Sequence, residues 1–346
     1  MELICCGKQM QIRMEKGGKI SILILGQSRM GKTVCALGLA EFLVGQGYSV
    51  QLIDFGMRWS PRDVRGLLAA GVTRKNVDAD GIVLTFASAS EVVGCSRIIL
   101  DAIGISSHAA ESLLRDEFSQ LCENSDGRFS WEDIMETLKG EEVAGNEQKW
   151  SEVLLARLSS LQGVPQIQFQ VDARADFSEA STIWDLWGIE EAYVQTVTYL
   201  ILYALYCQQR RKLRDDRGAK GVFAVLDEFQ NLDCSRRSIL GTCLVEGQKY
   251  GLGLILITQF LQGNFSEAVV NQFKQGGFRF YFRLTEEEAW AISRQLVYDS
   301  EQKKRLCEKL TRLPRGRCLF VGPHSLEGRQ KISEAPRFVE IKADIS

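Results

Sequence analysis

Short runs of apolar residues recur along this chain, separated by longer segments in which apolar residues return at helical spacing. The runs at 20–25, 222–226 and 252–257 hold at most one polar residue each. Strands buried on both faces of a parallel sheet have this composition, because helices cover both sides of such a sheet. The pattern therefore predicts a central, mostly parallel sheet.

The other segments alternate between predicted strands and predicted helices. Further strands are expected at 48–54, 81–86, 166–171, 182–186, 278–284 and 317–321. Helices are expected at 34–44, 190–213, 236–250 and 286–296. Such an alternation is typical of a doubly wound α/β sheet, and we predict this fold class.

The segment 91–161 departs from this alternation, because it is more polar and helical throughout. Residues 98–122 form an amphipathic stretch, and shorter helices are expected at 131–138 and 150–161. We therefore predict a helical insert at 91–161. The predicted core consists of 20–90 and 162–325, flanked by a short N-terminal segment, 1–19, and a C-terminal tail, 326–346.

A glycine-rich loop lies between the first apolar run and the first predicted helix. Its spacing, Gly-x-x-x-x-Gly-Lys-Thr, is typical of loops whose backbone N–H groups surround the phosphates of a nucleoside triphosphate such as ATP. The lysine of such a loop reaches the β- and γ-phosphates, where it also serves catalysis, and the threonine hydroxyl ligates Mg²⁺. Because strand, loop and helix follow in the required order, a chance glycine turn is the weaker interpretation. The predicted nucleotide-binding residues are Gly26, Gln27, Ser28, Arg29, Met30, Gly31, Lys32, Thr33 and Val34.

Two acids end the apolar run at 222–226. Asp227 is expected to hold Mg²⁺ together with Thr33, directly or through water. Glu228 is expected to orient and polarise the water that attacks the γ-phosphate. The weaker interpretation is a pair of surface acids in a turn between a strand and a helix.

The next apolar run ends in Thr258 and Gln259. If this strand lies beside the acidic one, Gln259 is placed to contact the γ-phosphate or its water and to act in catalysis. The alternative is a polar strand end that faces solvent. From the residues alone, the two interpretations have equal weight.

Composition and charge narrow the classes of function. The chain of 346 residues has a net charge of −2, so any contact with DNA must come from a local patch or from a surface built by assembly. Its ten cysteines form no Cys-x-x-Cys pair, and its two histidines have no ligand-spaced companion, which argues against zinc and histidine chemistry. We see no secretory leader, and the most apolar helical stretch, 197–206, is too short to span a membrane. These features predict a cytoplasmic protein with reduced thiols.

Four segments, taken together and in order, resemble the HerA/FtsK group of P-loop ATPases, which includes type IV secretion and conjugation ATPases. They are 26–33, 225–232, 246–259 and 313–322. The resemblance implies a RecA-like core and a ring, usually of six subunits, with ATP sites between subunits and DNA moving through or along the ring. It also implies that an arginine from the neighbouring subunit completes each site, with Arg279 the first candidate and Arg283 the next.

The leading hypothesis is an ATP-hydrolysing, Mg²⁺-dependent motor that acts on DNA independently of sequence and forms a homo-oligomer, expected to be a hexamer. A second hypothesis is an ATP-dependent assembly subunit that regulates a nuclease or secretion partner and moves no DNA itself. A third is a small-molecule kinase of the P-loop type, which Glu228 and Gln259 argue against because they suit attack by water.

Overall fold

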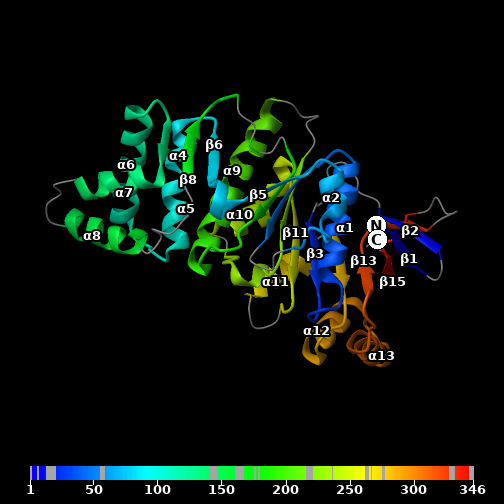
Figure 1. The fold of residues 1–346 in the computed structure, drawn as a ribbon. Helices are drawn as coiled ribbons and strands as arrows, with labels where there is room; N and C mark the ends of the chain where they lie inside the picture. The colour runs from blue at the N-terminus through cyan, green and yellow to red at the C-terminus, as the bar shows by residue number, and fades with distance from the viewer. Residues whose placement is uncertain are drawn as a thin grey trace.

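The computed structural model describes most of the chain. The described residues are 2–5, 8–12, 21–54, 59–140, 146–159, 167–174, 177, 180–215, 221–235, 237–261, 265, 267–274, 277–326 and 332–342. A large sheet runs through the molecule, with a smaller sheet and its helices at one end and the strands from both chain ends at the other (Figure 1).

The main sheet contains twelve strands among the described residues. In spatial order they are β14 (His324–Leu326), β2 (Lys8–Ile12), β1 (Glu2–Cys5), β15 (Arg337–Lys342), β13 (Arg317–Val321), β12 (Phe278–Tyr281), β3 (Ser21–Leu25), β11 (Leu252–Thr258), β10 (Val222–Leu226), β4 (Ser49–Asp54), β9 (Thr182–Asp185) and β5 (Thr73–Asn76). The seven strands from β12 to β5 are parallel to one another, and those from β13 to β14 pair antiparallel. The predicted α/β class with a mostly parallel sheet is confirmed.

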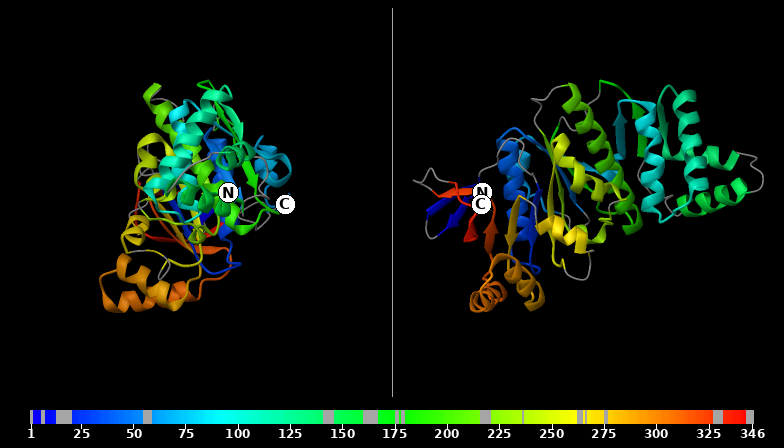
Figure 2. Two further views of the ribbon diagram at one scale, coloured as in Figure 1. Left: turned by 90° about the vertical axis from the view of Figure 1, so that its left-hand side faces the viewer. Right: turned by 180° about the vertical axis from the view of Figure 1, so that it is seen from behind.

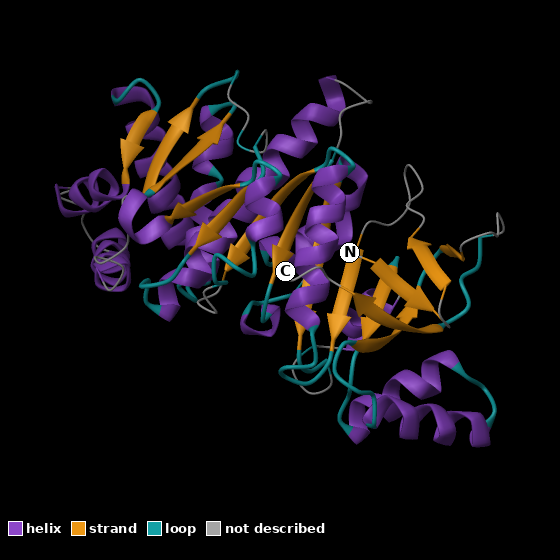
Figure 3. Ribbon diagram, turned by 45° about the vertical axis from the view of Figure 1, so that its right-hand side comes forward, coloured by secondary structure: helices purple, strands orange, loops and turns teal. Residues whose placement is uncertain are grey.

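Helices cover both faces of the parallel strands (Figure 3). The α-helices of the described residues are α1 (Lys32–Gly45), α2 (Arg65–Ala69), α3 (Val77–Asp80), α4 (Ala89–Val93), α5 (Cys95–Ala102), α6 (His108–Asn124), α7 (Trp131–Gly140), α8 (Asn146–Ser159), α9 (Glu191–Asp215), α10 (Ile239–Glu246), α11 (Glu267–Lys274), α12 (Glu286–Leu296) and α13 (Ser300–Thr311). Short 3₁₀ helices lie at Phe229–Asn231 and Gly247–Tyr250.

The alternation of side chains along β3 shows how the sheet divides the core. Ile22 and Ile24 point into the cluster that contains α1, whereas Leu23 and Leu25 point into the cluster that contains α9 and α10. Successive residues of a strand face opposite sides of its sheet, so a continuously apolar strand needs cover on both sides. This is why the run at 20–25 reads as a central strand.

A second sheet lies beside the main one. Its order is β6 (Ile82–Phe86), β8 (Ile167–Val171) and β7 (Arg128–Ser130), and α4 to α8 pack around it. The strands predicted at 81–86 and 166–171 therefore exist, but they pair with each other in this smaller sheet, outside the main one. The helical segment predicted at 91–161 includes one of the three strands, β7. The boundaries of core and insert stay a prediction.

Both segments outside the predicted core contribute to the main sheet. β1 pairs antiparallel with β15, with Glu2 opposite Lys342, so the described parts of the two chain ends lie side by side. Figure 2 shows from two further directions that they lie at the same end of the molecule. β2 and β14 extend the sheet beyond β1.

Candidate functional site

The glycine-rich loop begins where β3 ends and is fixed by the two strands beside it. The Gly26 N–H donates to the Thr258 carbonyl of β11 at 3.2 Å, and the Gln27 N–H donates to the Arg283 carbonyl at 2.8 Å. A Cβ on Gly26 would lie 2.6 Å from Phe282 Cβ, so the chain needs glycine where the loop starts.

The loop closes at Gly31, which has a φ of 104° and forms the N-cap of α1. Within the described part of the chain, the backbone N–H groups of residues 29–34 find no acceptor. No acidic side chain lies in the first turn of α1. Unused N–H groups at a helix N-terminus favour an anion, and they fit the phosphates that the sequence predicts here.

Lys32 turns back into the loop instead of towards solvent. Its side chain is 6% exposed, and its Nζ donates to the Gln27 carbonyl at 3.1 Å. Burial lowers the pKa of Lys32, and the charges of Glu228 and Asp227 oppose that shift. The ammonium is therefore held near two carboxylates, at the position where a triphosphate would enter the loop.

Asp227 reaches Thr33 across the end of β11. The Thr33 hydroxyl donates to Asp227 Oδ2 at 3.2 Å, although 194 positions separate the residues. Adjacent oxygen ligands of an octahedral Mg²⁺ at about 2.1 Å are roughly 3 Å apart, so this pair fits one shared ion. Asp227 is 1% exposed, and burial together with the nearby charge of Glu228 raises its pKa to about 6.

Glu228 is held by amide groups on both carboxylate oxygens. Its backbone is left-handed, with a φ of 51°, which is uncommon for a residue other than glycine. Gln259 Nε2 donates to Oε1 at 2.9 Å, and Gln230 Nε2 donates to Oε2. Gln259 Oε1 in turn accepts a hydrogen bond from the Ser28 hydroxyl at 2.8 Å. The glycine-rich loop, β10 and β11 are therefore linked through one chain of side chains.

These groups border one cavity of about 340 Å³. Its lining residues are Ser28, Arg29, Gly31, Lys32, Thr33, Val34, Asp227, Glu228 and Arg315. Arg315 belongs to the loop between α13 and β13, and the Gly316 N–H of that loop donates to the Met30 carbonyl at 3.0 Å. The segment 313–322 is one of the four that resemble the family, but its sequence predicts no role for Arg315. Nothing local in the sequence shows that this loop contacts the glycine-rich loop.

The two predicted arginine candidates lie outside this cavity of their own chain. Arg279 is on β12, where its positive charge opposes the rise that burial gives to the pKa of the fully buried Tyr281 hydroxyl. Arg283 Nε donates to the Leu313 carbonyl at 2.7 Å. A role in the site of a neighbouring copy stays a prediction for both.

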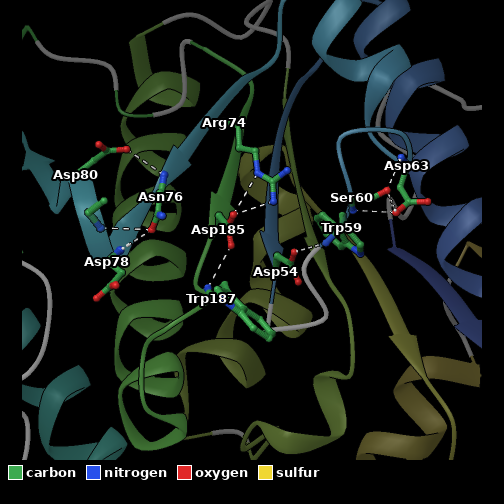
Figure 4. Close-up of polar contacts among 11 residues, drawn as sticks. Asp54, Trp59, Ser60, Asp63, Arg74, Asn76, Asp78, Asp80, Asp185 and Trp187 are labelled. Carbon is green, nitrogen blue, oxygen red and sulfur yellow. Dashed lines mark hydrogen bonds and ion pairs between the residues drawn. The ribbon is translucent and has the colours of Figure 1, made fainter.

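Further acids lie along the same edge of the sheet, at the ends of β4 and β9 (Figure 4). Asp54 Oδ2 accepts the Trp59 N–H at 2.8 Å, and Asp185 forms an ion pair with Arg74 at 2.7 Å. Among the described residues, no group of three or more His, Cys, Asp or Glu side chains is placed to hold a metal ion. Asp54 and Asp185 do not line the cavity of the glycine-rich loop, which separates them from Asp227 and Glu228.

The fold matches solved structures over nearly the whole chain. VirB4 of Thermoanaerobacter pseudethanolicus superposes with a TM-score of 0.61 at 17% identity, covering 93% of this chain and 89% of that one. The chain has the RecA-like P-loop fold of VirB4. The unbound monoclinic form of the bacterial conjugative coupling protein TrwBdeltaN70 gives a TM-score of 0.57 at 12% identity, covering 91% and 84%. TrwB in complex with ADP and Mg²⁺ gives 0.56 at 12%, covering 91% and 84%.

These matches confirm the predicted resemblance at the level of the fold. No protein-family model matches the chain, and no curated protein matches its sequence. In the described part of the chain, every helix is too short or too polar to cross a bilayer.

Proposed function

We propose that this chain hydrolyses ATP to drive a motor that handles DNA, and that it works in a ring with ATP sites between subunits. The observation that carries the proposal is the convergence of Thr33, Asp227 and Glu228 on the cavity of the glycine-rich loop. The RecA-like fold and the structures of TrwB, which was solved with ADP and Mg²⁺ and with an ATP analogue, support it.

The residues of the cavity fit a magnesium–triphosphate. The open N–H groups of residues 29–34 and the Lys32 ammonium would bind the β- and γ-phosphates. Thr33 Oγ1 and an Asp227 carboxylate oxygen would hold Mg²⁺, which neutralises charge on the phosphate oxygens when bound. Arg315 adds a cation from the same chain on another wall of the cavity.

Glu228 would accept the proton of the attacking water. The water oxygen bonds to the γ-phosphorus, the bond between that phosphorus and the β–γ bridging oxygen breaks, and ADP leaves. Gln259, which donates to Glu228 and accepts from Ser28, would orient both the carboxylate and the water.

The test is ATP hydrolysis and ATP binding in three proteins: the unaltered chain, Lys32→Ala and Glu228→Gln. Lys32→Ala should bind ATP weakly and not turn it over. Glu228→Gln should bind ATP as the unaltered chain does, while its turnover falls by about 10²- to 10⁴-fold, because the phosphate-binding groups remain and the base is lost. Full turnover in Glu228→Gln would remove Glu228 from this role.

The second candidate is an ATP-dependent assembly subunit that acts on a nuclease or secretion partner. The net charge of −2 favours it, since the chain as a whole does not attract DNA. Stimulation of ATP hydrolysis by DNA in the purified chain separates the two, because only the motor responds to DNA without a partner.

A further inference from the structure

One short segment of this slightly acidic chain is strongly basic. Residues 303–317 carry seven Lys or Arg side chains and one Glu, within a molecule whose net charge is −2. The segment contains most of α13 and the loop that leads into β13. Charge of one sign at this density attracts anionic partners.

The basic side chains gather on one face of α13. Arg305, Lys309 and Arg312 follow one another at spacings of four and three residues, which places them in a row along a helix. Cys307 and Leu310 lie on the opposite, buried face. The row borders a hollow of about 870 Å³, whose far wall includes Arg317 of β13 together with Phe338 and Glu340 of β15.

Two acids line this hollow, Glu308 of α13 and Glu340 of β15, and they balance only part of the charge of its four cations. Glu340 is paired with Arg317 at 3.2 Å, and Arg305 is paired with Glu301 on the exposed surface of the same helix, where an ion pair contributes little. Lys309 Nζ lies 5.7 Å from the centre of the Phe338 ring, which is 37% exposed. Among the described residues, neither Lys309 nor Arg312 forms an ion pair.

The loop from 313 to 317 separates this hollow from the candidate ATP site. Pro314 and Arg317 line the hollow, whereas Arg315, between them, lines the ATP cavity. Gly316 ties the loop to both sides, because its N–H donates to Met30 of the glycine-rich loop and its carbonyl accepts the Ile341 N–H of β15. A ligand in the hollow would press on the loop that carries Arg315.

We infer that this face of α13 and its hollow bind the phosphate backbone of DNA, and that this binding is communicated to the ATP site through the 313–317 loop. The inference rests on the proposed function, for which it names the contact surface. Phosphates match the observed chemistry, because Lys309 and Arg312, which form no ion pair among the described residues, can bind them without regard to base sequence.

The test compares two triple variants that lose the same charge. Arg305→Gln/Lys309→Gln/Arg312→Gln removes the row, and Arg115→Gln/Lys139→Gln/Lys149→Gln removes three exposed cations from α6, α7 and α8. Binding of a fluorescein-labelled 30-base-pair duplex is measured from 50 to 200 mM salt, and ATP turnover is measured with and without that duplex. Thermal melting and solution mass show whether each variant is folded and assembled.

The row variant should bind the duplex at least about tenfold more weakly at 50 mM salt, and its salt slope should fall by about 0.9 for each lost phosphate contact. Its basal ATP turnover should be unchanged, while stimulation by the duplex is lost. The α6–α8 variant should match the unaltered chain in all of these measurements.

Three other results would overturn the inference. Equal duplex binding by both variants would place the DNA contact elsewhere and leave the proposed function intact. Loss of assembly in the row variant alone would make this face a contact between copies. Retained duplex binding with lost binding of polyglutamate would assign it to an acidic protein. If the unaltered chain hydrolyses ATP but binds no duplex, the proposed function itself fails.

Discussion

Asp227 is a buried carboxylate that lowers the free energy of unfolding at neutral pH and is also a predicted Mg²⁺ ligand. Burial and the charge of Glu228 raise its pKa from 3.8 to about 6. Between these two values the folded chain holds a proton that the unfolded chain has released. The contribution of Asp227 to stability is therefore present at low pH and lost as the pH rises through about 6.

Asp227→Asn should raise the melting temperature of the Mg²⁺-free protein at pH 7.5 and raise it by only about half as much at pH 5, because the penalty develops between pH 3.8 and about 6. A shift of this size corresponds to at most about 3 kcal/mol at neutral pH. The same variant should lose the stabilisation that Mg²⁺ and ATP give to the unaltered chain. Melting curves from pH 5 to 8, with exposed Asp116→Asn on α6 as the control, test this; a stability difference that does not change with pH would contradict it.

Gln230 competes with the attacking water for the carboxylate of Glu228. Its amide donates to Glu228 Oε2 while Gln259 donates to Oε1, so a water that approaches Glu228 must share a carboxylate oxygen with one of these amides. Gln230→Leu should raise basal kcat several-fold and leave the KM for ATP unchanged, because the phosphate contacts are untouched.

Steady-state ATP turnover measures both constants. Gln230→Glu is the companion variant: it replaces the donor amide with a second carboxylate beside Glu228, and basal kcat should not rise in the same way. A fall of kcat in Gln230→Leu would show that this amide orients Glu228 for catalysis.

Among single residues, the sequence predicts those that belong to a motif with a fixed local spacing. Residues 26–33 and the pair Asp227–Glu228 follow from motifs that directly extend predicted strands, and the structure brings Thr33 and Asp227 within 3.2 Å. Gln230 and Arg315 were not predicted. Their positions depend on contacts with β11 and with the glycine-rich loop, and these contacts join elements far apart in the chain.

Between elements, the junction of α4 and α5 packs closely on α9. Gly94 has helical backbone angles, yet a Cβ there would lie 1.9 Å from the Tyr203 hydroxyl oxygen of α9. Gly94→Ala should therefore destabilise the fold by about 1–3 kcal/mol, since added volume in a packed contact forces side chains to move.

Tyr203→Phe should restore part of that loss in the double variant, because it removes the atom that the new methyl group meets. Chemical denaturation of the two single variants and the double variant measures the coupling. Gly45→Ala at the end of α1 has open space within 4 Å and should be neutral or stabilising. Additive effects at Gly94 and Tyr203 would show that α9 does not meet this junction.

Three elements with strong local signals have their predicted bounds, whereas others differ: the strand predicted at 278–284 ends at Tyr281, and the helix predicted at 236–250 spans Ile239–Glu246. The strands at 222–226 and 317–321 and the helix at 286–296 have their predicted bounds. The stretch 98–122 is two helices, because Gly104 adopts a φ of 72° and Ser107 caps α6. β1, β2 and β15 were missed, since these strands are short and the pairing of β1 with β15 joins the two ends of the described chain.

At the scale of the whole molecule, the proposed ring places one subunit's arginine in the site of the next. Arg279→Ala and Lys32→Ala should each be inactive alone. A mixture should regain part of the ATP turnover, because an Arg279→Ala subunit still supplies an intact glycine-rich loop and a Lys32→Ala subunit still supplies Arg279.

Turnover of the mixture, together with solution mass with and without ATP and DNA, tests this arrangement. Melting curves show whether Arg279→Ala is folded, since Arg279 contacts the buried Tyr281. Arg283→Ala gives the same test for the second candidate. A chain that stays monomeric with ATP and DNA and is fully active would exclude sites between subunits.

The net charge of the whole chain does not show how charge is distributed over its surface. A net charge of −2 argued against a global attraction to DNA, and that holds for the chain as a whole. The basic segment 303–317 is visible in the sequence, but its meaning depends on the fold. Only the placement of α13 beside β15 brings four of these cations around one hollow near the candidate ATP site.

Thr258, the last residue of β11, contacts both the glycine-rich loop and Gln230, the residue that hydrogen-bonds Glu228. Its carbonyl anchors the first glycine of the phosphate loop, and its hydroxyl donates to the Gln230 amide oxygen at 2.7 Å. A displacement of the nearby residues Phe260 and Leu261 would therefore move both the glycine-rich loop and the Gln230 side chain that binds Glu228. In the proposed mechanism, Thr258 would therefore couple nucleotide binding to the orientation of the group that accepts the proton from water.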